Sequence, residues 1–336
     1  MTAEGTEVDS SVTEGAGVEG ADSAALIGID WGSSRLRASV VSTAGCVIDR
    51  AESEAGVLLA GGRSELEASL RSVLGGWLDR WPNLPVIASG MVGSRNGLKE
   101  VAYVSTPAGV VDVGRGMESV RLGDRLTITI VPGLVHRGER GVDVMRGEET
   151  ALLGWLLDAG SARDRTIVMP GTHSKWVRLV SGQVSEFCTF PTGEMFSTLL
   201  QSASLASLVP DSAASDDSGD FQDGVAVGLE AKGILNDYFA IRAQAVAGCG
   251  GDRNVRQYLS GLLLGYEIAE ARGRSLADVD APLVIIGQDQ LARRYERALG
   301  IAGLPSVVAD QDCLATGWLA LARVGSDNAR QKGEPA

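Results

Sequence analysis

Residues 27–35 read Ile-Gly-Ile-Asp-Trp-Gly-Ser-Ser-Arg, and residues 167–175 read Ile-Val-Met-Pro-Gly-Thr-His-Ser-Lys. Each stretch begins as a short apolar run, the pattern of a buried strand, and continues into a turn of small residues that ends on a cation. A turn without bulky side chains lets backbone N–H groups approach a phosphate, and its hydroxyl groups add donors. Two such hairpins predict a duplicated architecture with one phosphate-binding turn in each half.

The elements outside these hairpins follow the same order in both halves. In the first half, periodicity predicts strands over 26–30, 36–42 and about 46–50, a helix over 64–80, a strand over 85–88, a long polar loop, a strand over 126–131 and a helix over 145–158. In the second half it predicts strands over 166–169, 176–180 and 184–189, helices over 194–208, 221–247 and 254–271, then a strand over 283–286, a helix over 289–299, a strand over 306–309 and a helix over 312–323.

The repeated order predicts an α/β fold of two RNase H-like domains of the actin and hexokinase type, with a nucleotide cleft between them. Each sheet should be mixed, because the three opening strands of each half are joined by turns too short for parallel crossovers. The expected division is an acidic disordered tail over 1–24, domains over 25–160 and 161–325, the second with helical insertions, and a flexible tail over 326–336.

The net charge of -13 is concentrated in two acidic stretches. Residues 1–25 carry six acids, residues 209–224 carry five, and the rest of the chain has 32 acids against 30 basic residues. A nearly neutral body argues against nucleic-acid binding, which requires a basic face. No apolar run suits a membrane span, no secretory signal opens the chain, and the four cysteines are far apart, so we expect a cytoplasmic protein with reduced thiols.

The two turns supply the candidate nucleotide-binding groups. Backbone and hydroxyl donors would hold the phosphates of ATP, and the carboxylate of Asp30 would bind the accompanying Mg²⁺. Lys175 would act as a catalytic charge partner of the transferred phosphoryl group. Taken alone, the first turn is also what an ordinary hairpin turn looks like, and Lys175 could be a solvated lysine at a strand end. The other candidate donors are Gly32, Ser33, Ser34, Arg35, Gly171, Thr172, His173 and Ser174.

Phosphoryl transfer to an alcohol also needs a carboxylate beside the acceptor hydroxyl. Residues 143–150, Asp-Val-Met-Arg-Gly-Glu-Glu-Thr, stand where the chain enters the helix that closes the first half. Asp143 is the first candidate for the catalytic base, and Glu148 is its rival. The alternative is structural, with Asp143 as the N-cap of the helix and the two glutamates favouring its first turn.

Two other glycine-rich segments are candidate binding loops. Residues 89–97 form a long loop on which Arg95 could pair with a substrate carboxylate while Ser94 and Asn96 bond hydroxyl groups. A solvent-facing Arg95 is an equal alternative. Gly287, between a buried strand and a helix, would let the nucleoside pack closely on the backbone.

Taken together, these motifs resemble the 2-dehydro-3-deoxygalactonokinase family of sugar-acid kinases. The resemblance rests on blocks in order along nearly the whole chain, at residues 29–37, 89–94, 131–134, 143–150, 170–176 and 259–262. Residues 187–194 also resemble a family segment, but Cys188 stands where the family usually has Arg, and Pro191 where it has Met.

The resemblance implies ATP-dependent phosphorylation of 2-dehydro-3-deoxy-D-galactonate, or a closely related keto-deoxy sugar acid, at its terminal 6-hydroxyl. ATP and Mg²⁺ are the implied cofactors, a small sugar acid is the implied partner, and a homodimer is compatible with the sequence. The alternative function is a non-catalytic or regulatory module that binds ATP or a sugar on the same scaffold, and an acceptor-independent ATPase is a further one.

Overall fold

The computed structural model describes residues 23–123, 126–139, 141–158, 164–208, 219–249, 253–277, 281–309 and 313–332, with side chains to residue 327. The acidic tail predicted over 1–24 lies outside these ranges except for its last two residues, and so does the 209–218 part of the acidic insertion. None of the helices in the described part of the chain is both long and apolar enough to cross a membrane.

The first half is built on a six-stranded sheet with the order β3-β2-β1-β4-β7-β6. One face of this sheet is apolar, because alternate residues of β1 and β2 are hydrophobic and buried. Helix α1 covers that face with Leu66, Leu70, Leu74 and Trp77, which recur at helical spacing. The bounds are β1 Ala24–Trp31, β2 Leu36–Ser42, β3 Val47–Ser53, α1 Arg63–Arg80, β4 Val86–Gly90, β6 Glu118–Leu122 and β7 Leu126–Ile130.

The second half repeats the arrangement in a five-stranded sheet with the order β12-β11-β10-β13-β14. In each sheet the first three strands are antiparallel and the next strand pairs in parallel with the first. The predicted mixed sheets and duplicated α/β fold are therefore confirmed. The bounds are β10 Arg165–Met169, β11 Ser174–Val180, β12 Gln183–Phe190, β13 Leu283–Ile285 and β14 Ser306–Val308.

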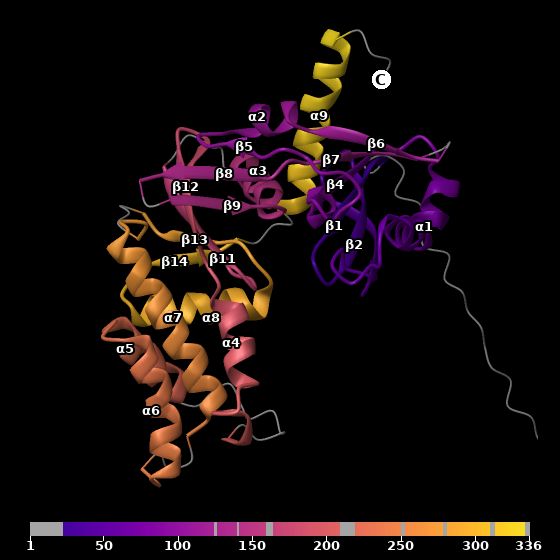
Figure 1. Cartoon of the computed structure of the whole chain (residues 1–336). Helices are drawn as coiled ribbons and strands as arrows, with labels where there is room; N and C mark the ends of the chain where they lie inside the picture. The colour runs from indigo at the N-terminus through magenta and orange to yellow at the C-terminus, as the bar shows by residue number, and fades with distance from the viewer. Residues whose placement is uncertain are drawn as a thin grey trace, which may run out of the picture.

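Helices gather on one side of the second sheet, and their colours in Figure 1 run from pink at α4 through orange at α7 to golden yellow at α8. They are α4 Thr192–Leu200, α5 Asp220–Leu229, α6 Ile234–Val246, α7 Val255–Gly273 and α8 Asp289–Ile301, with a 3-10 turn at Ala206–Leu208. The helix predicted over 221–247 is two helices, because Ala231 and Gly233 have φ of 51° and 158° and interrupt it. The helix predicted over 194–208 ends at Leu200.

A third, three-stranded sheet was not predicted. It has the order β5-β8-β9, with bounds Val104–Ser105, Leu134–Gly138 and Gly141–Met145. It lies beside β12, so it joins the first half to the edge of the second sheet (Figure 1). The predicted long loop therefore contains β5, a 3-10 turn at Met91–Gly93, helix α2 Val110–Arg115 and strand β6.

Helix α3, Glu148–Asp158, begins three residues later than predicted. Gly147 has a φ of 114°, which ends strand β9 and turns the chain into the helix. Asp143 therefore lies within a strand, and its predicted alternative role as the helix N-cap is wrong.

The last helix, α9 Cys313–Lys332, crosses back to the first half and packs on α3, α2 and β1 (Figure 1). Trp318 fills the space above Gly28, and its Nε1 donates to Ser89 Oγ at 3.1 Å. Residues 326–332, predicted as part of a flexible tail, continue this helix. The domain boundaries stay a prediction.

Candidate functional site

A cavity of about 360 Å³ opens between the two halves. Asp30, at the carboxyl end of β1, and Arg146 to Glu148, at the start of α3, line it from the first half. Met169, at the end of β10, and Gly287, just after β13, line it from the second. Ligands of open α/β sheets bind at the carboxyl ends of strands, so this cavity is the candidate active site.

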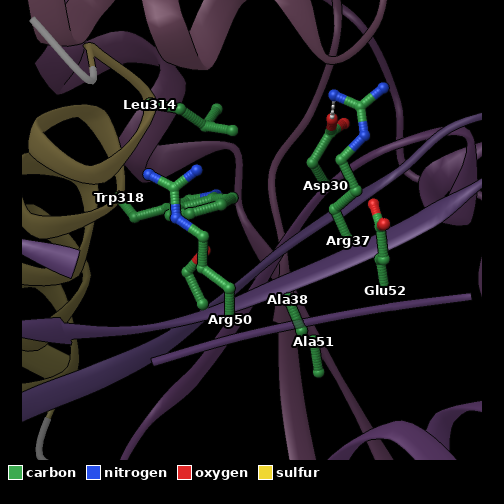
Figure 2. A pocket seen from close by; sticks show the side chains of 9 residues that line it. Asp30, Arg37, Ala38, Arg50, Ala51, Glu52, Leu314 and Trp318 are labelled. Carbon is green, nitrogen blue, oxygen red and sulfur yellow. Dashed lines mark ion pairs between the residues drawn. The ribbon is translucent and has the colours of Figure 1, made fainter. Parts of the chain in front are cut away.

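Asp30 faces Arg37 of the neighbouring strand. Arg37 Nη1 lies 3.6 Å from Asp30 Oδ2, and Figure 2 shows the two side chains meeting at the end of the β1–β2 hairpin. Burial raises the pKa of the Asp30 carboxyl, the positive charge of Arg37 opposes the rise, and the negative charge of Glu148 adds to it. Asp30 and Glu148 are thus close enough to repel one another, which is where a bound cation would be favourable.

Asp30 and Arg37 also line a second cavity of about 440 Å³ that adjoins the first (Figure 2). Arg50 and Glu52 border it on β3, and Leu314 and Trp318 border it on α9. The polar face of the first sheet therefore carries charges of both signs beside the cleft.

Glu148 and Lys175 meet across the cleft. Lys175 Nζ lies 3.5 Å from Glu148 Oε1, and the lysine is only 4% exposed although it belongs to a turn predicted to bind phosphate. The other oxygen, Glu148 Oε2, accepts a hydrogen bond from the backbone N–H of Arg146 at 3.0 Å. The pair brings a candidate base and a candidate phosphoryl partner together from the two halves.

Glu149, the next residue, is fully buried. Its carboxylate accepts the backbone N–H of Gly147 at 2.6 Å and the hydroxyl of Thr150 at 3.1 Å. Burial and the neighbouring Glu148 raise the pKa of Glu149 to about 8, although these hydrogen bonds act in the opposite direction. Glu149 thus fixes the turn that aims Glu148 and Arg146 into the cleft.

The first turn is exposed, and backbone hydrogen bonds from residues 57 and 58 hold it in place. The backbone oxygens of Gly32 and Ser33 accept hydrogen bonds from Val57 and Leu58, each at 3.1 Å. Ser33 and Ser34 are exposed. Arg35 forms a surface ion pair with Glu54, 3.2 Å between Nε and Oε1, and does not line the cavity.

The second turn packs against the start of helix α4. A Cβ on Gly193 would lie 2.5 Å from the backbone oxygen of Gly171, so only glycine allows this approach. Thr172 accepts the backbone N–H of Glu194 at 2.9 Å. His173 Nε2 lies 2.6 Å from Glu194 Oε2, and both side chains are about half exposed. Thr172 and His173 are exposed, whereas Ser174 is buried and bonds the backbone of Phe190.

A buried carboxylate that the sequence did not reveal supports the second turn. Glu267 of α7 accepts Nε1 of Trp176 at 2.8 Å, the hydroxyl of Tyr295 at 2.9 Å and the hydroxyl of Thr192. Burial raises the pKa of Glu267, against the effect of these donors. The network ties β11, α4, α7 and α8 together behind the turn.

A cavity of about 280 Å³ opens beside Gly171 in the second half. Phe196, Leu263 and Leu291 give it apolar walls, and Gln290 and Arg294 add polar groups. An apolar slot with a few polar groups suits a nucleoside base.

Asp143 lies outside the cleft. Its Oδ2 accepts the backbone N–H of Thr189 at 2.6 Å, and its Oδ1 accepts the Thr189 hydroxyl at 2.7 Å and the N–H of Val144 at 2.7 Å. With Cys188 and Arg274 it borders a different cavity, of about 560 Å³, between β9 and β12. The structure therefore separates Asp143 from Glu148, and it places Cys188 away from the cleft.

The three candidate substrate residues of the 89–97 loop do not line the inter-half cavity. Ser94 donates its hydroxyl to the backbone of Met91 at 2.7 Å, and Arg95 and Asn96 are exposed and do not line the inter-half cavity. Arg146 lines it instead. Sequence analysis placed the 143–150 segment at the cleft but predicted no role for Arg146, because the residues that Arg146 contacts, Val101 and Tyr103, lie on a loop distant in sequence.

Described residues hold no cluster of three or more His, Cys, Asp or Glu side chains that would form a metal centre on their own. Mg²⁺ is usually held by one or two carboxylates together with substrate phosphates. Asp30 and Glu148, whose negative charges repel one another, are the two carboxylates of the cleft that could hold Mg²⁺ together with the phosphates.

Two mixed sheets that share the order third, second, first and fourth strand, with glycine turns and charged side chains facing a shared cleft, define a two-domain α/β protein of the actin-like ATPase and sugar kinase class. The chain belongs to the 2-keto-3-deoxy-galactonokinase family, whose model matches residues 30–321. The resemblance of the sequence motifs to this family is thus confirmed.

Individual relatives agree with this assignment. The 2-dehydro-3-deoxygalactonokinase of Escherichia coli strain K12 is 38% identical over 280 residues, which cover 83% of this chain and 91% of that protein. A protein of Rhizobium meliloti strain 1021 described as a probable 2-dehydro-3-deoxygalactonokinase, DgoK1, is 38% identical over 232 residues, 68% of this chain and 74% of its own. A crystal structure from Sinorhizobium meliloti assigned to the same activity has a TM-score of 0.76 at 33% identity, covering 90% of this chain and 96% of that one.

Proposed function

We propose that this protein uses ATP to phosphorylate the 6-hydroxyl of 2-dehydro-3-deoxy-D-galactonate or a closely related keto-deoxy sugar acid. The observation that carries the proposal is the meeting of Glu148 and Lys175 across the cleft, beside Asp30. The family supplies the substrate class. A cytoplasmic location, where ATP is abundant, belongs to the same proposal.

Glu148 is the proposed base, in preference to Asp143. Glu148 borders the cleft and has one oxygen free of backbone hydrogen bonds, the one that faces Lys175. Both oxygens of Asp143 are already bonded to Thr189 outside the cleft. Glu148 would accept the proton of the sugar hydroxyl as the hydroxyl oxygen forms a bond to the γ-phosphorus, while the bond from that phosphorus to the β–γ bridging oxygen breaks and ADP leaves.

Lys175 and the two turns would stabilise the phosphate charge. When the sugar hydroxyl approaches, Lys175 can shift its contact from Glu148 to the transferred group, since one ammonium carries three donors. Gly32 to Ser34 and Gly171 to Ser174 would offer backbone and hydroxyl donors, and Gly287 would lie near the nucleoside. The slot beside Gly171 is the proposed site of the base.

Mg²⁺, when bound, would neutralise phosphate charge and shield Asp30 from Glu148. Asp30 is the proposed protein ligand. Arg37 holds that carboxylate in place through their ion pair, so the chain presents a fixed oxygen donor at the end of β1.

A screen of acceptors tests the proposal. Purified protein with MgATP should release ADP with 2-keto-3-deoxy sugar acids and not with neutral hexoses, and ³¹P NMR should place the new phosphate ester on C6. Turnover restricted to neutral sugars would exclude an acidic substrate. ATP binding without transfer would favour a regulatory module, and ADP release without any acceptor would favour an ATPase.

Two variants test whether both halves hold the nucleotide. Asp30→Ala and Lys175→Ala should each reduce ADP release by at least about 100-fold, the scale of losing a group that stabilises transition-state charge. Normal rates in both variants would refute the proposed cleft.

A further inference from the structure

Arg146 carries donors that the protein leaves unused. Its Nε and Nη1 atoms are buried and have no hydrogen-bond partner among the described residues, while Nη2 donates to the backbone oxygen of Val101 at 2.8 Å. Burying charged N–H groups without partners is costly. An anionic ligand that received these hydrogen bonds would remove that cost.

The neighbouring carboxylates of Glu148 and Glu149 have other partners than the guanidinium of Arg146. Glu148 is engaged with Lys175 and with the backbone N–H of Arg146, and Glu149 accepts Gly147 and Thr150. The two acids nearest in sequence are thus occupied by other groups. The guanidinium group has N–H donors and no acceptor, so an acceptor on a ligand could satisfy the unused donors.

The surroundings hold the guanidinium in one position. The plane lies over the ring of Tyr103, 4.2 Å from Cζ to the centroid, which is a cation–π contact. A Cβ on Gly93 would lie 2.8 Å from Nη1, so the glycine of the 89–97 loop leaves the space that the guanidinium uses. A preorganised arginine suits bidentate recognition of a planar carboxylate.

The location of Arg146 suits contact with the acceptor sugar acid rather than with the nucleotide. It contacts Val101, Tyr103 and Gly93, all on the loops of the first half, whereas the second phosphate turn and the proposed base slot belong to the second half. Arg146 borders the same cavity as Glu148, on the other side of Gly147.

We infer that Arg146 binds the carboxylate of the sugar-acid substrate, with Tyr103 and Gly93 holding its guanidinium in place. The inference rests on the proposed function, of which it gives the acid-recognition site. Arg146 replaces the exposed Arg95 in that role. One end of the acid would then meet Arg146, and its terminal hydroxyl would meet Glu148.

The test compares the sugar acid with its uncharged C1 carboxamide. In Arg146→Gln, the KM for 2-dehydro-3-deoxygalactonate should rise about 10- to 100-fold, the scale of losing charge-assisted hydrogen bonds. The KM for the carboxamide and the KM for ATP should change less than about threefold, because neither ligand presents a carboxylate to this position. Arg146→Lys, which keeps a cation, should give an intermediate KM for the acid.

Arg95→Gln is the matched control, since it removes an exposed arginine from the adjacent loop, and it should leave all three KM values unchanged. Gly93→Ala should raise the KM for the acid while keeping every charge, because its Cβ displaces Nη1. Circular dichroism and thermal unfolding would verify that each variant is folded.

Three kinetic results would overturn the inference: an unchanged KM for the acid in Arg146→Gln, an equal rise for acid and carboxamide, or a rise confined to ATP, which would assign the arginine to phosphate. Calorimetric binding of the acid without ATP separates the two proposals. Native protein that binds the acid through Arg146 but transfers no phosphate contradicts the proposed function alone. Native protein that does not bind the acid contradicts both.

Discussion

Glu148 Oε1 lies 3.5 Å from Lys175 Nζ, so the first residue of α3 meets the second strand of the other half across the cleft. The pair gives the buried ammonium group a nearby carboxylate and links the two halves beside the cleft. In the proposed reaction, the same two groups lie on opposite sides of the transferred phosphoryl group. We therefore expect bound substrate to separate them.

Replacing Glu148 by Gln should reduce kcat about 10²- to 10⁴-fold, because the amide cannot accept the proton of the sugar hydroxyl. The change keeps the size of the side chain and an acceptor for the N–H of Arg146. Steady-state kinetics and calorimetric binding of ATP would measure the effect, and ATP affinity should change only a few-fold. A near-normal kcat would remove Glu148 from the role of base.

Asp143→Asn should act on stability rather than on chemistry. Because both carboxylate oxygens accept hydrogen bonds from Thr189, the variant should lose about 1–3 kcal/mol of unfolding free energy and keep kcat within about tenfold. Urea unfolding and steady-state kinetics would measure the two effects.

Thr189→Val is the second single variant of a double-mutant cycle, since it removes the hydroxyl that donates a hydrogen bond to Asp143. The double variant should be less destabilised than the sum of the single variants, as expected for residues in direct contact. A strong fall in kcat with unchanged stability in Asp143→Asn would instead return Asp143 to the role of base.

The pKa of about 8 for Glu149 predicts that stability falls as pH rises. An unfolded glutamate titrates near 4.5, so between about pH 4.5 and 8 the folded state keeps a proton that the unfolded state has released. Folding then binds a proton, and the unfolding free energy decreases with pH by up to about 1.4 kcal/mol per unit until the pH passes about 8. Glu149→Gln cannot ionise and should remove this slope while keeping an acceptor for Gly147.

Urea midpoints between pH 5 and pH 9 would measure that slope. The native curve should fall relative to the Glu149→Gln curve, whereas Glu100→Gln, at an exposed position, should run parallel to the native protein. Parallel native and Glu149→Gln curves would show that Glu149 is ionised in the folded state.

The two hairpins were predictable because their information is local. β1 is a short apolar run that is buried over four consecutive residues, and the turn of small residues follows directly in the sequence. The third sheet was not predictable, since β5 pairs with β8 and β8 with β9 through residues that carry mixed, short patterns. Missing it placed Asp143 at a helix start and not on a strand.

The same limit applies to the site. Asp30, Glu148 and Lys175 stand in recognisable motifs, so the sequence predicted them as site residues, and it placed Asp143 ahead of Glu148 as the base; these assignments stay predictions. The sequence did not indicate the proposed role of Arg146, because that role depends on contacts with Val101, Tyr103 and Gly93, which form only when the 89–103 loops fold over the start of α3.

Gly28 of β1 and Trp318 of α9, near opposite ends of the chain, pack closely on one another, which the sequence alone could not reveal. A Cβ on Gly28 would lie 2.0 Å from Cε3 of Trp318, so α9 could not stay docked on β1 without moving. Glycine inside a strand often marks such a close approach. Gly28→Ala should therefore destabilise the protein by at least about 1–3 kcal/mol, the usual cost of overpacking a filled core.

Gly75→Ala is the matched control for the same chemical change. Gly75 lies within α1 and a Cβ there would meet nothing within 4 Å, so alanine should stabilise the protein by about 0.5–1 kcal/mol through its higher helix propensity. Urea unfolding of both variants would measure effects of opposite sign. If Gly28→Ala were as stable as the native protein, α9 would not be held against β1 by Trp318, and the cleft residues Cys313 and Leu314 at its start would lose that anchor.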